Sequence, residues 1–307
     1  MVKPSLVISD LYTIRDFVRW GISRFNQADL YYGHGTTNAK DDALALITYT
    51  LFLPSDIDDT FFDARLTSDE KEQLVKLFKR RIDERIPVPY LTGEAWFLGL
   101  PYKVDKRVII PRSPIAELIE NSFQPWLGKN YPHRILDMCS GSGCIGIACA
   151  HQFESAHIDL VDLSDQALAI ASENIALHNM EQTVSAIKSD MFTTLNNEYD
   201  KYDLIVSNPP YVDATDFHSM PVEFSHEPKM ALTAGEDGLE MVHILLSQAA
   251  DYLTDDGVLI VEVGNSGEAL EHCYPGVEFN WLEFERGGVG VFAITAKELR
   301  QLQAKVN

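Results

Sequence analysis

The segment Ile135-Leu136-Asp137-Met138-Cys139-Ser140-Gly141-Ser142-Gly143-Cys144-Ile145-Gly146 decides the fold of this chain. It has the pattern of a short apolar strand, a glycine-rich loop and the start of a helix. Glycine lets a backbone approach a ligand closely, and a helix N-terminus offers unpaired N–H donors. The segment therefore predicts a strand–loop–helix unit that binds a nucleotide-like group, although a turn with a purely structural role has the same pattern.

Strand-like and helical stretches alternate beyond this loop. The apolar runs lie at 135–136, 158–161, 184–187, 204–206 and 258–263. This alternation is typical of a Rossmann-like α/β fold with a doubly wound sheet. The last two runs, 277–284 and 289–295, are joined by a short link, whereas a parallel crossover needs about a dozen residues. We therefore expect a seven-stranded sheet whose last strand is antiparallel.

Residues 1–95 show helical periodicity instead and predict a small helical domain. Apolar residues recur at three and four positions within 9–25, and Asn38 is suited to cap a helix that ends near residue 52. A capping box at Thr67-Ser68-Asp69-Glu70 predicts a third helix through residue 86. Residues 96–111 alternate around a polar turn at 105–107. They predict a β-hairpin that links this domain to a catalytic domain at 112–307.

Basic residues gather near the end of the third helix, at Lys79, Arg80, Arg81 and Arg85. Their attraction to the negative end of the helix dipole explains this grouping without any partner. A patch that contacts RNA is the alternative explanation.

The composition is that of a soluble globular protein, with 46% hydrophobic and 23% charged residues. No apolar run reaches the roughly 18 residues of a membrane span, and residues 1–5 lack the apolar core of a signal peptide. We therefore expect a cytoplasmic protein with no membrane partner. The four cysteines form no Cys-x-x-Cys pair and have no histidine at ligand spacing, so we expect reduced thiols, mostly buried, without a metal site or disulfides.

The net charge of −21 is spread unevenly. Residues 1–95 carry 12 basic and 15 acidic residues, whereas residues 96–307 carry 13 and 31. A negative field repels polyanions and attracts basic partners. The charge therefore disfavours free nucleic acid as a substrate and favours a basic protein, although solubility alone also explains it.

Two classes of cofactor fit the glycine loop. Gly141, Gly143 and Gly146 match the dinucleotide fingerprint, and Asp162 ends the next strand, where it suits a ribose in either an NAD or an S-adenosylmethionine enzyme. Asp137 distinguishes them, because a carboxylate entering the loop repels a pyrophosphate but attracts the ammonium group of a methionine moiety. The loop therefore favours S-adenosylmethionine.

Asn208-Pro209-Pro210-Tyr211 follows the run 204–206, at the edge of the sheet where α/β proteins bind ligands. Two prolines make a stiff loop that exposes carbonyl oxygens. The side-chain oxygen of Asn208 and the carbonyl of Pro209 can together accept both hydrogens of an NH2 group, and Tyr211 can flank the substrate. Two fixed acceptors orient a planar nitrogen and stabilise the charge that develops when it attacks a sulfonium methyl group. The loop predicts methyl transfer to such a nitrogen.

Seven segments together resemble the HemK-type N5-glutamine methyltransferases nearly end to end. They are Tyr90-Leu91-Thr92-Gly93, Ile110-Pro111-Arg112-Ser113-Pro114 with Glu117, Asp137 to Gly143, Val161-Asp162-Leu163-Ser164, Ser189-Asp190-Met191-Phe192, Asn208 to Tyr211, and His226-Glu227-Pro228. The resemblance implies a class I methyltransferase fold behind a helical substrate-recognition domain.

The resemblance also assigns residues to the two ligands. The cofactor S-adenosylmethionine would be bound by Asp137, Ser140, Gly141 and Gly143 near its methionine end, Asp162 with Leu163 near the ribose, Asp190 with Met191 at the adenine, and Asn208. The substrate would be bound by Asn208, Pro209, Pro210 and Tyr211. Glu227-Pro228 would shape the substrate side, for which the residues alone give no reason.

Two positions depart from the family pattern. Cys139 stands where the family loop usually has glycine, so this position lacks a residue that adopts positive φ easily. Met191 stands where the family often has an aromatic ring, which leaves a thioether to contact the adenine.

Within the family, Tyr31-Tyr32-Gly33-His34-Gly35-Thr36 and the segment 111–115 look like the branch that modifies the third protein of the large ribosomal subunit. A glutamine of that protein is therefore the expected acceptor. Peptide-chain release factors and N6-adenine in nucleic acid are alternative acceptors, and an assembly factor without catalytic activity is a further alternative. A packed interhelical turn would explain the Tyr31 segment equally well.

Overall fold

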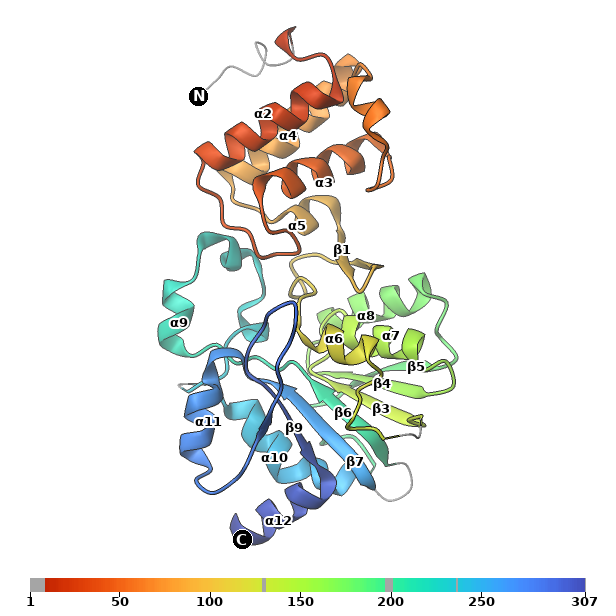
Figure 1. The fold of residues 1–307 in the computed structure, drawn as a ribbon, viewed down its shortest axis with the longest axis vertical. Coiled ribbons are helices and arrows are strands. Elements are labelled where there is room, and N and C mark those ends of the chain that lie inside the picture. Colours follow the sequence, from red (N-terminus) through yellow and green to blue (C-terminus); the bar gives the residue numbers. More distant parts are fainter. Residues whose placement is uncertain (1–8, 129–130, 197–200, 236, 307) are drawn as a thin grey trace. The chain divides into compact units, whose positions relative to one another are not determined.

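The computed structural model describes residues 9–128, 131–196, 201–235 and 237–306, so residues 1–5 lie outside the described part (Figure 1). The chain forms two compact units. One comprises Met1–Glu94 with Pro221–His226, and the other comprises Ala95–Met220 with Glu227–Asn307. Nothing in the local sequence indicates that segment 221–226 belongs to the helical unit. No helix in the described ranges has the length and hydropathy to cross a bilayer.

The helical unit is held by capped helices. It contains α2 (Ile14–Gln27), α3 (Ala39–Leu51), the 3-10 helix η1 (Asp59–Asp63), α4 (Ser68–Asp83), α5 (Val88–Thr92) and the 3-10 helix η2 (Val222–His226). Asn38 caps α3, and Thr67 with Glu70 forms the predicted capping box of α4. The predicted helix 9–25 is interrupted before Ile14, because Thr13 forms its own capping box with Asp16.

Two of the four basic residues at the end of the third predicted helix form ion pairs with buried carboxylates. Arg81 Nε lies 2.8 Å from Asp42 Oδ2, and Arg81 Nη1 lies 3.5 Å from Glu223 Oε1. Arg85 Nε is 3.0 Å from the same Glu223 oxygen. These pairs, and a hydrogen bond from the Tyr31 N–H to Glu223, hold η2 within the helical unit. Arg81 and Arg85 therefore neutralise buried carboxylates, in addition to any interaction with the helix dipole.

The Tyr31 to Thr36 segment is packed between helices. The rings of Tyr31, His34 and Phe224 contact one another, and Thr36 donates a hydrogen bond of 2.6 Å to Asp42. The segment therefore has a structural role in the helical unit, whatever else it contacts.

The second unit contains the predicted seven-stranded sheet, in the order β5-β4-β3-β6-β7-β9-β8. Its strands are β3 (Arg134–Met138), β4 (His157–Asp162), β5 (Val184–Lys188), β6 (Tyr202–Ser207), β7 (Leu253–Glu262), β8 (Asn280–Trp281) and β9 (Val291–Thr295). Strands β3 to β7 are parallel, and β9 runs antiparallel between β7 and β8. The predicted class I methyltransferase fold is confirmed, although β8 is much shorter than the predicted run 277–284.

Helices cover both faces of this sheet (Figure 1). They are α6 (Ile115–Glu120), α7 (Cys144–Gln152), α8 (Asp165–Leu177), α10 (Glu240–Tyr252), α11 (Gly267–Cys273) and α12 (Ala296–Val306). The unit also contains α9 (Ala214–Ser219) and the 3-10 helices η3 (Lys229–Ala231) and η4 (Gly264–Ser266). Strand residues alternate between two cores: Ile135 packs with α6, α7 and α8, and its neighbour Leu136 packs with α10, α11 and α12. Burial on both faces explains the nearly continuous apolar runs in the sequence.

The predicted hairpin at 96–111 was wrong in its position. The hairpin consists of β1 (Glu94–Phe97) and β2 (Leu100–Lys103), joined by Leu98 and Gly99. Both linking residues have positive φ, which suits the twist of a two-residue hairpin turn. The later residues form no strand, and the N–H of Ile110 instead donates to the carboxylate of Glu227 at 2.9 Å.

Candidate active site

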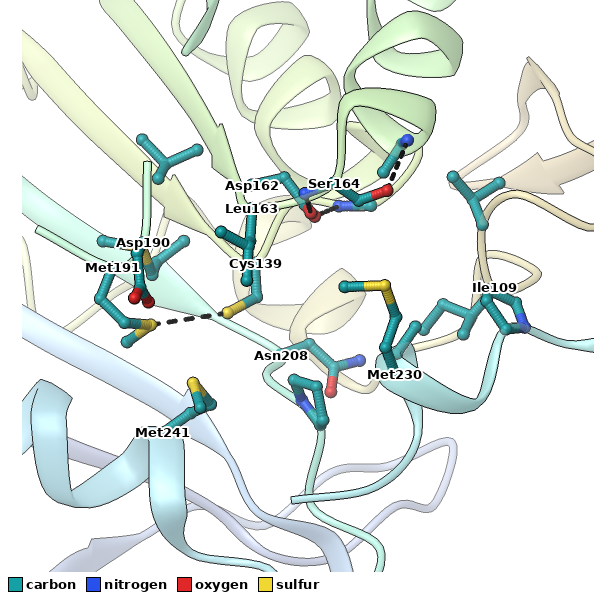
Figure 2. Close-up of a pocket in the computed structure, with 18 of the residues that line it drawn as sticks. Ile109, Cys139, Asp162, Leu163, Ser164, Asp190, Met191, Asn208, Met230 and Met241 are labelled. Carbon is teal, nitrogen blue, oxygen red and sulfur yellow. Dashed lines mark hydrogen bonds between the residues drawn. The ribbon is translucent and has the colours of Figure 1, made fainter. Parts of the chain in front are cut away.

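A cavity opens at the carboxyl ends of the parallel strands (Figure 2). Its volume is about 870 Å³ when the solvent space at its mouth is included. Of the twelve residues assigned to the two ligands, seven line it: Gly141, Asp162, Leu163, Asp190, Met191, Asn208 and Pro210. Pro228, expected to shape the substrate side, lines it as well. The other five of the twelve do not line it: Asp137, Ser140, Gly143, Pro209 and Tyr211. Sequence reasoning missed several lining residues for which no pattern gives a signal, among them Ile109, Met138, Met230, Thr233 and Met241.

Asp162 fixes the glycine loop at the end of β4. Its Oδ2 accepts a hydrogen bond of 2.9 Å from the Gly141 N–H, and its Oδ1 accepts one of 2.9 Å from the Ser164 N–H (Figure 2). Burial raises the pKa of this carboxyl despite these bonds. Each oxygen of a carboxylate has a further lone pair, so Asp162 can still accept hydrogen bonds from a ligand in the cavity.

Asp137 and Ser140 lie in the interior of the loop. Asp137 Oδ2 accepts a hydrogen bond of 2.8 Å from the Gly146 N–H, and burial raises the pKa of this carboxyl to about 7. Asp137 Oδ1 and Ser140 Oγ are buried and have no hydrogen-bond partner among the described residues. Unsatisfied buried polar atoms each cost about 1–3 kcal/mol, so this loop suits a ligand that brings polar groups to it.

Gly143 ends the loop with φ of 79° and caps α7. A Cβ there would lie 2.7 Å from Leu160 Cδ1, in the buried core, whereas Gly141 has φ of 55° and no atom within 4 Å of such a Cβ. Both alanine variants incur the cost of positive φ, about 1 kcal/mol, but only Gly143→Ala adds a steric clash. We expect Gly143→Ala to lower the free energy of unfolding by about 1–3 kcal/mol more than Gly141→Ala does, as measured by urea denaturation. Equal losses would contradict the packing role of Gly143.

Several sulfur-containing residues line the cavity. Cys139 Sγ lies 4.0 Å from Met191 Sδ, and Met138, Met230 and Met241 contribute to the same lining (Figure 2). Both Cys139 and Met191 have a left-handed backbone although neither is glycine, with φ of 61° and 50°. The loop therefore keeps a left-handed conformation at position 139, and polarisable side chains provide the apolar surface there.

Asn208 leaves the end of β6 and lies across the cavity from Asp162 (Figure 2). Its side-chain nitrogen donates to the carbonyl of Arg112 at 3.5 Å. This bond uses the nitrogen within the protein, so the side-chain oxygen is the atom available to an incoming N–H donor.

Arg112 is held in turn by Glu227. The guanidinium donates two hydrogen bonds to this carboxylate, of 2.6 and 2.7 Å, and the Glu227 side chain is fully buried. A bidentate pair of this kind fixes geometry as well as charge. The structure thus gives Glu227 the physical reason that the sequence did not: it fixes the backbone to which Asn208 is anchored.

Tyr211, which the sequence predicted to flank the substrate, is not among the residues that line the cavity. Its hydroxyl donates to Glu262 Oε1 at 3.0 Å, and Ser113 donates to Glu262 Oε2 at 2.6 Å. A Cβ on Gly264 would lie 2.5 Å from the Tyr211 ring, so the ring packs directly on that glycine. Tyr211 therefore holds the loop against the end of β7.

Burial raises the pKa of Glu262 to about 7, above the 4.5 of a free glutamate. The contribution of this group to stability is therefore fully present below about pH 4.5 and is lost as the pH rises through about 7. The free energy of unfolding of the wild type should therefore fall between about pH 5 and about pH 8. In Glu262→Gln we expect this fall to be smaller by about 2 kcal/mol, as measured by denaturation across that range. Glu268→Gln, at an exposed position, is the control. An unaltered pH dependence in Glu262→Gln would refute this assignment.

Asp237, His243 and Cys273 come together outside the cavity. Their potential ligand atoms lie within 4.8 Å of one another, and His243 Nδ1 is 2.8 Å from the Tyr274 hydroxyl. The sequence spacing of cysteine and histidine did not reveal this group.

All four cysteines are free thiols, but only Cys144 and Cys149 are buried, so the expectation of mostly buried thiols was only half right.

The chain is similar to several known proteins. Residues 122–238 match the methyltransferase small domain family. The chain is 48% identical over 298 residues to the ribosomal protein uL3 glutamine methyltransferase of Francisella tularensis, covering 97% of this chain and 94% of that protein. It is 49% identical to the protein of the same name from Xanthomonas campestris, covering 97% and 96%. A solved methyltransferase from Pyrococcus furiosus is 17% identical, with a TM-score of 0.47 over 64% of this chain and 89% of that one.

Proposed function

Because the chain belongs to the ribosomal protein uL3 glutamine methyltransferases, we propose that it transfers a methyl group from S-adenosylmethionine to the side-chain amide nitrogen of a glutamine in uL3. This family confirms the resemblance found in the sequence. The single observation that carries the chemistry is the position of Asn208, at the carboxyl end of β6 and on the wall of the cavity.

The residues of the cavity fit S-adenosylmethionine. Asp162 would accept hydrogen bonds from the ribose hydroxyls, and Met191 with Asp190 would border the adenine. The loop at Gly141 would receive the methionine end, where Asp137 and Ser140 have buried atoms without partners among the described residues. When bound, this cofactor supplies a methyl group on a positively charged sulfur.

Asn208 orients the acceptor nitrogen. Its side-chain oxygen and the Pro209 carbonyl would accept hydrogen bonds from the two N–H groups of the glutamine amide, which turns the lone pair of the nitrogen toward the cofactor side of the cavity. The same acceptors would stabilise the positive charge that develops on the nitrogen as it takes the methyl group from the sulfonium sulfur, which leaves as a neutral thioether. One amide proton would then pass to solvent. The Arg112–Glu227 pair and the Tyr211–Glu262 bond keep both ends of the loop in place.

Charge supports a basic protein as the acceptor, because residues 96–307 carry 31 acidic and 13 basic residues. An acceptor assay tests this choice. The purified enzyme with labelled S-adenosylmethionine should label uL3 isolated from cells that lack the enzyme. Labelling of release factors or of nucleic acid alone, with uL3 unlabelled, would overturn the assignment.

A further inference from the structure

A second, open groove lies beside the end of β7, outside the cavity already described. Its floor is partly apolar, from Trp281, Leu282, Phe284 and Val289, and the last of these is 67% exposed. The lining residues come from two segments: residues 264–271, in η4 and α11, and residues 281–290, from the end of β8 through the loop before β9. Val289 is exposed and the other three are partly buried, and a partly exposed apolar surface of this kind suits a partner segment better than bulk water.

The groove is acidic. Glu268, Glu271 and Glu283 line it, and no lysine, arginine or histidine is among its lining residues in the described part of the chain. Arg286, in the same loop, is turned to α6, where its guanidinium pairs with Glu117 and Glu120. The loop's own cation therefore does not neutralise the groove.

The groove adjoins the substrate loop through one residue. Gly264 lines the groove, and it also packs against the ring of Tyr211. Tyr211 is the last residue of the Asn208-Pro209-Pro210-Tyr211 loop. A peptide that presents its glutamine to Asn208 therefore has a neighbouring surface on which its flanking residues can lie.

We infer that this groove binds a lysine- or arginine-rich segment of the ribosomal protein that flanks the methylated glutamine. The inference rests on the proposed function and adds a docking surface to it. The three glutamates attract the basic side chains, and the apolar floor accommodates their aliphatic stems. The groove thereby contributes to substrate affinity and leaves the chemical step to Asn208.

A pair of triple variants tests the groove at constant net charge. The first carries Glu268→Gln, Glu271→Gln and Glu283→Gln; glutamine at 271 keeps an acceptor for the Trp281 N–H, which donates to Glu271 at 2.7 Å. The control carries Glu154→Gln, Glu181→Gln and Asp256→Asn, which are exposed near the amino ends of β4, β5 and β7. We expect the groove variant to raise KM for uL3 about tenfold at low salt with kcat unchanged, and this difference to shrink at high salt. The control should behave as wild type.

The outcomes separate the two proposals. The docking inference would be overturned by an unchanged KM for uL3 in the groove variant, or by an equal rise of KM in the control. A change in the oligomeric state of the groove variant would also overturn it, because a second copy of the chain would then be the occupant of the groove. Failure of the wild-type enzyme to methylate uL3 would contradict the proposed function instead. In that case, binding of uL3 to the wild type and to each triple variant, measured by calorimetry, still decides on the groove: weaker binding only in the groove variant supports it, and equal binding refutes it.

Discussion

Replacing Asn208 with alanine should lower kcat for methyl transfer by about 10²- to 10³-fold, because it removes one of two acceptors that orient and stabilise the reacting nitrogen. Asn208 lies at the cavity wall and its side-chain nitrogen bonds the Arg112 carbonyl, so the truncation removes a fixed polar group without opening the protein core. Single-turnover rates with saturating S-adenosylmethionine measure the effect. A kcat near that of the wild type would refute the catalytic role of Asn208.

Two controls accompany that variant. S-adenosylmethionine should bind Asn208→Ala far better than it binds Asp162→Ala, because Asp162 both faces the cavity and fixes the glycine loop through Gly141 and Ser164. Asn208→Asp keeps an acceptor oxygen in place and should retain more activity than Asn208→Ala. If both Asn208 variants lose cofactor binding completely, the effect is structural and the assigned role is wrong.

Replacing Glu227 with alanine should destabilise the protein by about 2–4 kcal/mol and also reduce kcat. The substitution leaves the Arg112 guanidinium without its bidentate partner and the Ile110 N–H without its acceptor. Because the Arg112 carbonyl anchors Asn208, a shift of this segment also moves the acceptor oxygen. Urea denaturation and single-turnover kinetics measure the two effects.

A double-mutant cycle with Arg112→Ala isolates the pair. The two substitutions should be strongly non-additive in both stability and rate, because either one breaks the same contact. Additive effects, or a Glu227→Ala protein as stable and active as the wild type, would show that the pair does not position the loop.

Much of the site followed from local sequence rules. The strand-ending positions of Asp162 and Asn208 placed both at one edge of the sheet, and the structure brings them to opposite sides of one cavity. Such predictions succeed because parallel strands of an α/β sheet all end at the same edge. The antiparallel last strand followed equally from the short link before it.

Long-range pairings were out of reach of the same rules. Glu227 pairs with Arg112, 115 positions away, and Glu223 pairs with Arg81 in the helical unit. Local sequence also does not reveal that the hydroxyl of Tyr211 donates to Glu262, a buried carboxylate at the end of β7. The misplaced hairpin has a similar cause, since Leu98 carries no obvious preference for the positive φ that the turn requires.

The mass of uL3 from cells with and without this gene tests the central claim most directly. Tandem mass spectrometry of peptides from both strains should find one glutamine that carries an additional methyl group on its side-chain amide only when the gene is present, and the Asn208→Ala gene should fail to restore it. A uL3 protein with the same methylation in both strains would contradict the account.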